Sequence, residues 1–232
     1  MKFNRFLIYS SLAIVATLAL TACNSTGKYV NKDGSVYFSY WTFSFGTIDR
    51  ELPDVDPATF KAVEDWLGHD DNHVYFKDNL IENADPKTLK AEKYPMFRDR
   101  KDYYYMTAAL RVSDMESFKV LKRSDDDIWA RDSRYAYYDS LRIESPDIES
   151  FRVVAHNTAV DSKNVYRYGK ILPLADPATY EETWKGFYSR DKAHIWYMGT
   201  LLEDADYATF VVDDDTHAHD SKGSFHREER VK

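Results

Sequence analysis

Aspartates that recur at fixed spacings are the residues whose types and positions could do chemistry. One set lies four residues before a large apolar residue: Asp56, Asp85, Asp114, Asp147, Asp176 and Asp206. A Ser or Thr follows each of them three residues later: Thr59, Thr88, Ser117, Ser150, Thr179 and Thr209. Such carboxylates could bind Ca²⁺ along one face, or they could accept backbone amides as caps of turns. No copy has a glycine-rich loop with several carboxylates, so we expect caps.

A second set of aspartates lies five residues before an aromatic residue: Asp70, Asp99, Asp132, Asp161 and Asp191. Two acidic runs also occur, Asp125–Asp127 and Asp213–Asp215, and His217, His219 and His226 follow the second run. Imidazole and carboxylate are ordinary ligands of transition metals. Short acidic clusters are more often solvent-exposed loops, and we predict that residues 213–232 form a polar, disordered tail. We therefore assign no metal ligand and no cofactor.

No set of residues has the spacing of a known catalytic motif. The sequence lacks Gly-x-Ser-x-Gly, His-Glu-x-x-His and a glycine-rich phosphate-binding loop. The histidines outside the C-terminal segment are scattered: His69, His73, His156 and His194. We expect a protein that is not an enzyme, and a hydrolase with an unrecognised site stays open as an alternative.

The N-terminus has the pattern of a secretory signal. Lys2 and Arg5 precede an apolar run, residues 6–18, which is too short to span a bilayer comfortably. Leu20-Thr21-Ala22-Cys23 follows and resembles the bacterial lipobox. We predict a signal peptide at residues 1–22, a lipid on Cys23 and a tether at residues 23–30. Asn24 and Ser25 lack the aspartate associated with inner-membrane retention, which favours the periplasmic face of the outer membrane in a Gram-negative host.

Composition limits the class of protein. The 232 residues include 18 Tyr, 13 Phe and 5 Trp, and aromatic residues favour strands. The formal net charge is −8, and removal of Lys2 and Arg5 with the signal makes it −10 (29 basic against 39 acidic residues). A chain this acidic is repelled by nucleic acid. Cys23 is the only cysteine, which excludes an internal disulfide.

Internal repeats organise residues 31–212 into six copies. Five copies pair a leading aromatic with a large apolar residue fourteen positions later: Tyr75 and Leu89, Tyr104 and Phe118, Tyr137 and Phe151, Tyr166 and Tyr180, Trp196 and Phe210. β-Branched and aromatic runs, polar turns and a returning aliphatic segment predict a β-hairpin in each copy. An Asp-x-x-Ser/Thr turn then closes the unit, and a short strand such as residues 118–121 can complete it.

This pattern predicts an all-β protein made of tandem β-hairpin repeats of about 30 residues with short capped helical turns. Stacking of the units would give a solenoid-like or curved sheet array, with propeller-like closure as the alternative. The first copy, Tyr37 with Phe60, contains nine extra residues. Trp41, Phe43 and Phe45 lie in this insertion, outside the packing of the repeat itself. We therefore predict that they form an interaction surface.

The repeat marks resemble the DKNYY family of bacterial envelope proteins. The best matches are residues 161–166, Asp-Ser-Lys-Asn-Val-Tyr, and residues 175–180, Ala-Asp-Pro-Ala-Thr-Tyr. The resemblance covers roughly residues 31–212, and Met115 and Ile148 replace the proline in the third and fourth units. It implies an architecture and a location in the cell envelope, and it implies no reaction.

Together these features predict a membrane-anchored envelope lipoprotein that binds another envelope or secreted protein without catalysis. An immunity protein against a basic secreted toxin is one version, because an acidic surface suits a basic partner. Binding of cell-wall glycan through exposed aromatic rings is the alternative. An aromatic row that faces solvent would favour glycan, and a cleft with paired carboxylates would revive the hydrolase.

Overall fold

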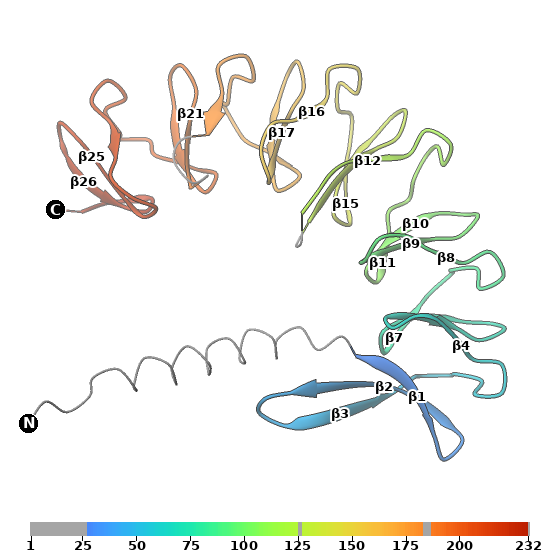
Figure 1. The fold of residues 1–232 in the computed structure, drawn as a ribbon. Helices are drawn as coiled ribbons and strands as arrows, with labels where there is room; N and C mark the ends of the chain where they lie inside the picture. Colours follow the sequence, from blue (N-terminus) through green and yellow to red (C-terminus); the bar gives the residue numbers. More distant parts are fainter. Residues whose placement is uncertain (1–26, 125–126, 183–186, 232) are drawn as a thin grey trace, which may run out of the picture. The chain divides into compact units, whose positions relative to one another are not determined.

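The computed structural model describes residues 27–124, 127–182 and 187–231. Every regular element in these residues is a β-strand (Figure 1), which confirms the all-β prediction. The predicted signal peptide and Cys23 lie outside the described residues. Each Asp-x-x-Ser/Thr segment forms a single hydrogen-bonded turn, as from the Thr59 amide to the Asp56 carbonyl at 3.2 Å, and does not continue into a helix.

The chain divides into two compact units, Met1–Ala109 and Leu110–Lys232. The first unit contains three sheets. Their strands are β1 (Lys28–Lys32), β2 (Ser35–Thr42) and β3 (Gly46–Glu51); β4 (Lys61–Glu64), β5 (Leu67–His69), β6 (Val74–Phe76) and β7 (Asn79–Ile81); and β8 (Lys90–Ala91), β9 (Met96–Arg98), β10 (Tyr103–Tyr105) and β11 (Ala108–Ala109).

The second unit contains four four-stranded sheets. Their strands are β12 (Lys119–Arg123), β13 (Ile128–Arg131), β14 (Ala136–Tyr138) and β15 (Leu141–Ile143); β16 (Arg152–Val153), β17 (Thr158–Val160), β18 (Val165–Arg167) and β19 (Lys170–Ile171); β20 (Glu181–Glu182), β21 (Tyr188–Arg190), β22 (Ile195–Tyr197) and β23 (Thr200–Leu201); and β24 (Val211–Val212), β25 (His217–Asp220), β26 (Gly223–His226) and β27 (Glu229–Val231).

Each sheet is an antiparallel meander whose strands follow chain order, and no sheet closes into a barrel. Among the described residues, no strand of one sheet pairs with a strand of another. Four strands fit into a repeat of about 30 residues because most of them contain only two to five residues. The segment expected to complete the third unit, residues 118–121, instead begins the next sheet as part of β12. The sequence repeat therefore crosses the boundary between two sheets.

The turn between the third and fourth strands repeats with a left-handed first residue. The backbone φ is positive at Lys77, Met106, Asp139, Tyr168, Met198 and Arg227. Turns with this handedness match the twist of the strands that they join. Gly169 follows Tyr168 with φ of 73°. An added Cβ at Gly169 would lie 2.8 Å from the Tyr138 Cβ and 2.9 Å from the Leu141 Cδ2, so this hairpin packs closely on the preceding sheet.

Gly169→Ala should therefore lower the unfolding free energy by about 2–3 kcal/mol, because it adds both backbone strain and overpacking. Gly34→Ala is the matched control, because Gly34 has φ of 83° and no atom within 4 Å of an added Cβ. It should cost only the backbone strain, about 1 kcal/mol. Urea unfolding of both variants measures the difference, and equal losses would contradict the close packing at Gly169.

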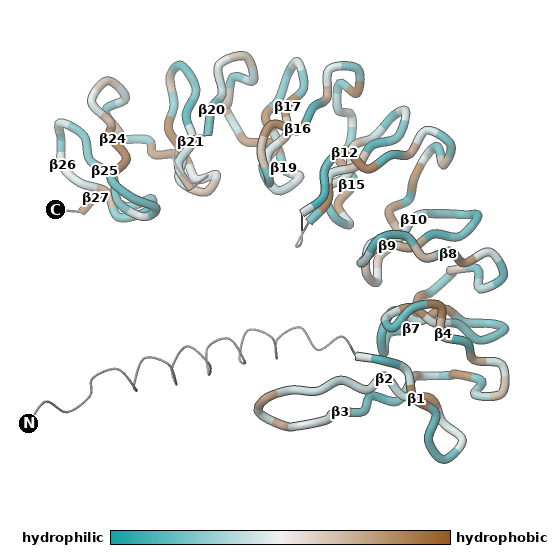
Figure 2. The backbone as a smooth tube through the Cα atoms, viewed as in Figure 1, coloured by the Kyte–Doolittle hydropathy of each residue, from teal (hydrophilic) through white to brown (hydrophobic). Residues whose placement is uncertain are grey.

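Aromatic and aliphatic side chains form the core between consecutive sheets of each unit. In the first unit, Val36 and Phe38 of β2 pack with Tyr75 of β6. In the second unit, Trp129 and Tyr166 share one cluster, and Trp196 packs with residues of β17 and β18 in the next. Figure 2 shows hydrophobic residues in short segments that alternate with hydrophilic ones along the chain. The repeated aromatics are core residues and do not form a solvent-facing stripe.

Two predicted boundaries are wrong. Residues 28–30 do not belong to a tether, because they form β1, where the Tyr29 ring packs 5.4 Å from the Phe38 ring. Residues 213–232 do not form a disordered tail, because 217–231 supply three strands of the last sheet. Ala218 and Phe225 are fully buried there, whereas His217 and His219 on the same sheet are exposed. Buried and exposed residues alternate along these strands, but most of the residues are polar, so the sequence alone suggested disorder.

The described residues include no helix with the length and apolar character needed to cross a membrane.

Candidate functional site

The insertion in the first copy forms the outer end of the β2–β3 hairpin. β1 pairs with β2 only as far as Lys28 and Ser39, whereas β2 continues to Thr42 and pairs with β3 as far as Gly46. Figure 1 shows this hairpin as the longest in the first unit. Gly46 takes a φ of 69°, and the Phe45 amide donates to the Thr42 Oγ1 at 3.1 Å, which fixes the turn. The hairpin end thus has a defined shape.

Trp41, Phe43 and Phe45, here called the aromatic tip, are exposed as predicted for an insertion outside the repeat packing. Their exposed fractions are 43%, 86% and 79%. The rings of Trp41 and Phe43 lie 6.4 Å apart at 85°, so they form an edge contact and no flat platform for a sugar ring. Residues 34–48 contain no Asp, Glu, Lys or Arg. The aromatic tip can therefore enter an apolar environment without burying a charge.

A second exposed apolar surface lies on the second unit and was missed in the sequence. It consists of Leu141, Tyr168 and Met198, here called the turn row, at the third-to-fourth-strand hairpins of three consecutive sheets. The hairpins touch, because Gly169 packs on Tyr138 and Leu141, and an added Cβ at Gly199 would lie 3.5 Å from the Arg167 Cδ. The available signal was an apolar residue at two turn positions, Tyr168 and Met198, which polar residues usually occupy, whereas Leu141 begins β15.

Leu174 is another exposed apolar residue of the second unit, with an exposed fraction of 67%. Its φ of 65° is left-handed, a conformation that Asp54, Asn83 and Ser145 adopt at the same place in other copies. Asn and Asp tolerate this conformation better than Leu does. An exposed apolar residue in an unfavourable backbone conformation is a candidate for contact with a partner.

The aspartates of the second set are buried and organise the turn between the second and third strands. One oxygen of Asp161, Oδ1, accepts the backbone amides of Lys163 and Asn164, both at 2.7 Å. The same pair of bonds forms at Asp70, Asp99, Asp132 and Asp191. These carboxylates are turn caps and face the interior.

The other oxygen joins this turn to the segment that arrives from the preceding sheet. Asp161 Oδ2 accepts the Asp147 amide at 2.9 Å and the Tyr166 hydroxyl at 2.6 Å. Asp70, Asp99, Asp191 and Asp220 accept the equivalent aspartate amide, and Asp132 accepts the amide of Ser113. The five-residue spacing from Asp to Tyr in the sequence therefore reports a hydrogen bond across the turn.

The recurring three-residue spacing in the first set of aspartates also reports hydrogen bonds. Ser150 Oγ donates to Asp147 Oδ2 at 2.7 Å and accepts the Ser162 amide at 2.8 Å. The hydroxyl of the equivalent Ser or Thr accepts the matching amide in the other copies, at Asp71, Arg100, Ser133, Lys192 and Ser221. The structure places both sets of aspartates in caps and links, in agreement with the cap interpretation.

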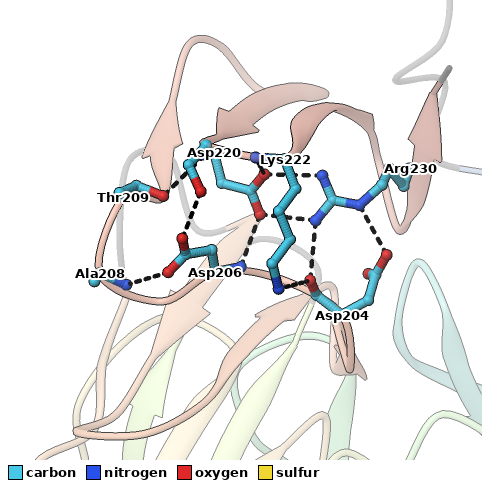
Figure 3. A network of polar contacts seen from close by, with 8 residues as sticks. Asp204, Asp206, Ala208, Thr209, Asp220, Lys222 and Arg230 are labelled. Atoms are coloured by element: carbon cyan, nitrogen blue, oxygen red, sulfur yellow. Dashed lines mark hydrogen bonds and ion pairs between the residues drawn. The ribbon is translucent and has the colours of Figure 1, made fainter.

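The last sheet completes the same network with different residues (Figure 3). Figure 3 shows Asp220 between Asp206 and Arg230. Asp220 lies five residues before Phe225, which lacks a hydroxyl. Arg230 takes its place, because its Nη2 donates to Asp220 Oδ2 at 2.7 Å and its guanidinium lies 4.2 Å from the Phe225 ring centre. Its Nε also donates to Asp204 at 2.8 Å. Residues 213–231 are therefore a seventh copy, which the Asp-to-aromatic spacing could have revealed.

The comparisons agree with this repeated unit. The model of the DKNYY family matches residues 29–200, well over half of the chain. The chain belongs to the DKNYY family. No curated protein and no solved structure matches significantly. The family match ends within the sixth sheet, so the DKNYY unit at residues 213–231 rests on the structure alone.

Histidines near carboxylates in this DKNYY protein form pairs and not larger clusters. His217 Nδ1 lies 3.0 Å from Asp214, and His219 Nδ1 lies 2.9 Å from Asp213. Asp127 is buried and accepts the Tyr138 hydroxyl at 2.9 Å, whereas its neighbours Asp125 and Asp126 lie outside the described residues. Within the described part of the chain, no group of three or more such residues could hold a metal ion.

Acid should destabilise the DKNYY repeats through their buried aspartates. Burial raises the pKa of Asp161, but the Tyr166 hydroxyl and backbone amides outweigh it, so the net pKa lies below the ordinary value. Backbone amides also outweigh burial and lower the pKa of Asp70, Asp132 and Asp191, together with a tyrosine hydroxyl at Asp132 and a histidine at the other two. A lowered pKa stabilises the fold above about pH 4 and loses that contribution as pH falls further. Urea unfolding should therefore show little change from pH 7 to 5 and a steep decline below about pH 4.

Asp161→Asn is the control for this pH dependence, because it removes one of the titrating groups. Its stability should depend less steeply on pH, by up to about 1.4 kcal/mol per pH unit. The same slope in the variant and the parent protein would contradict the role of Asp161.

Proposed function

We propose that this DKNYY protein is a lipid-anchored protein of the bacterial envelope that binds another protein and catalyses no reaction. The observation that carries this proposal is the structural role of the recurring aspartates. Both aspartate sets and the hydroxyls beside them are used in one hydrogen-bond network that holds the sheets together. What the repeats offer to other molecules is exposed apolar surface, which on a monomer commonly marks an interaction site.

The lipid anchor is supported by the lipobox-like segment before Cys23 and by the start of the fold. β1 begins at Lys28, so only residues 24–27 separate Cys23 from a folded sheet. A lone cysteine at this position needs no disulfide partner. The Asn24-Ser25 pair supports the outer membrane if the host is Gram-negative.

The turn row favours a protein partner over a glycan. Leu141 and Met198 are aliphatic and Tyr168 already contacts the Tyr138 ring edge-on at 6.1 Å, so the row lacks parallel aromatic faces for sugar stacking. Aliphatic residues, Met and Tyr are ordinary components of protein interfaces. The net negative charge of the mature chain favours a basic partner.

Photo-crosslinking in intact cells tests this proposal. A photoreactive residue replaces Met198 of the turn row in the full-length chain, with Val120 of β12 as the control site of similar exposure. One dominant, basic protein adduct at Met198 and none at Val120 is the expected result. Glycan fragments at Met198, or the same adducts at both sites, would overturn the binding proposal.

The anchor is tested separately. Cys23→Ala should move the protein from the membrane to the soluble fraction, and mass spectrometry of the parent protein should find a lipid on residue 23. Retention of Cys23→Ala in the membrane, with no modification in the parent protein, would overturn the lipid anchor and leave the partner proposal standing.

A further inference from the structure

We infer that the aromatic tip, Trp41, Phe43 and Phe45, inserts into the lipid surface to which Cys23 is attached. This inference rests on the proposed anchor and adds a second membrane contact, which fixes the orientation of the first sheet. It goes beyond partner binding because its ligand is the membrane interface itself. Strand direction, reach and local charge of the first sheet carry it.

Strand direction places the aromatic tip and the anchor at the same end of the sheet. β1 and β2 are antiparallel, and Lys28 at the start of β1 lies opposite Ser39. The chain therefore arrives from Cys23 at the level of Ser39. β2 continues beyond Ser39 in the opposite direction to β1, so the hairpin extends back towards the side from which the chain arrives.

The two segments also have the same reach. Lys28 lies five positions after Cys23, and Ser44 at the end of the hairpin lies five positions after Ser39, so four residues separate each pair. Five extended residues span about 17 Å in either case, which is the upper limit for the tether. When the tether is fully extended, Cys23 and the end of the hairpin can reach the same membrane surface. When the tether is less extended, the end of the hairpin lies below the membrane surface at which Cys23 is attached.

The chemistry of the aromatic tip suits the lipid interface. Trp and Phe combine a large apolar surface with stiff side chains, and Trp is enriched at the interface between membrane and water. The rings are exposed, and residues 34–48 carry no ionisable acid or base in a chain whose residues are 30% charged. The nearest charges in sequence are Asp33, which lies in the β1–β2 turn, and Asp49, which lies opposite Ser39 at three residue pairs from the Thr42–Gly46 pair. Entry of the tip therefore buries no charge.

Vesicle partition of the mature chain, residues 23–232, tests the inference. A maleimide carrying one acyl chain is coupled to Cys23, because a single chain binds membranes only marginally and a second contact then becomes visible. Neutral phosphatidylcholine vesicles remove any contribution from lipid charge. Phe43→Ser with Phe45→Ser should lower the partition at least about tenfold relative to the parent protein.

The matched control is Ile171→Ser with Leu174→Ser, two apolar residues that are also more than half exposed but lie in the second unit. Its partition should equal that of the parent protein. Both pairs are at the surface, so each variant should fold, and circular dichroism verifies this. Unchanged partition of the Phe43 and Phe45 variant, or an equal loss in the control, would overturn the inference.

A longer tether gives an independent measurement. Ten Gly and Ser residues inserted after Cys23 lower the effective concentration of the tip at the membrane, so the difference between the parent protein and the Phe43 and Phe45 variant should shrink. An unchanged difference would mean that the aromatic tip does not contact the membrane near Cys23, which would overturn the inference. The chemical lipid makes this result independent of whether cells modify Cys23, so failure of the anchor proposal and failure of the tip inference remain distinguishable.

Discussion

Asp161→Ala should lower the unfolding free energy by about 3–5 kcal/mol. The carboxylate of Asp161 is buried and accepts four hydrogen bonds, from the amides of Asp147, Lys163 and Asn164 and from the Tyr166 hydroxyl. Alanine accepts none of them, so these donors lose their partners in a site with little access to water. Urea unfolding followed by tryptophan fluorescence suits this variant, because Trp129 and Trp196 are fully buried in the clusters on either side of the sheet.

Two further variants separate the contributions at this site. Glu149→Ala changes an exposed residue in the Asp147–Ser150 turn, which is linked to Asp161, and should cost less than about 0.5 kcal/mol. Tyr166→Phe removes only the hydroxyl and should cost about 1 kcal/mol. If Asp161→Ala is no more costly than Tyr166→Phe, the links to the backbone amides contribute little and the proposed role of the buried aspartate is wrong.

Deletion of residues 213–232 should destabilise the sixth sheet by more than about 4 kcal/mol. The last sheet contributes Ala218 and Phe225 to the cluster that contains Tyr188, Tyr197 and Leu202. Loss of one buried Phe side chain alone typically costs 3–5 kcal/mol, and the deletion also exposes its neighbours. Hydrogen exchange of β21 and β22 measures the effect, together with the solubility of the truncated chain.

The control for this deletion is Phe225→Leu, which keeps an apolar side chain in the cluster. It should cost much less than the deletion, about 1–2 kcal/mol. If β21 and β22 keep their exchange protection in the truncated chain, residues 213–232 do not stabilise the sixth sheet and the prediction is wrong.

The repeat period, the strands and the capping aspartates could be predicted from the sequence because they depend on local spacing. Asp161 and Tyr166 lie across one turn, and Asp147 and Ser150 lie within another, so five-residue and three-residue spacings carry the information. The strand assignment followed from aromatic and β-branched runs. These features need no knowledge of how sheets pack.

The rest depends on contacts between distant residues. The bond from the Asp147 amide to Asp161 spans fourteen residues and exists only because two turns meet. The exposure of Met198 depends on the neighbouring hairpins. The last sheet was missed because Phe225 stands among Ser, Gly and His, and because Arg230, which bonds Asp220 where other copies use a tyrosine hydroxyl, lies ten residues from it and outside the repeated spacing. Substitutions of this kind keep the geometry and erase the motif.

The separation of the sheets also has a consequence for how the number of repeats can change in evolution. Because no described strand pairs with a strand of another sheet, neighbours are joined only by side chains and by the aspartate links. Duplication or loss of one whole period, for example residues 137–165, would leave every surviving junction with its own complete set of contacts. Chain length can therefore change in steps of one period, and the long β2–β3 hairpin shows that the end of a hairpin also accommodates extra residues.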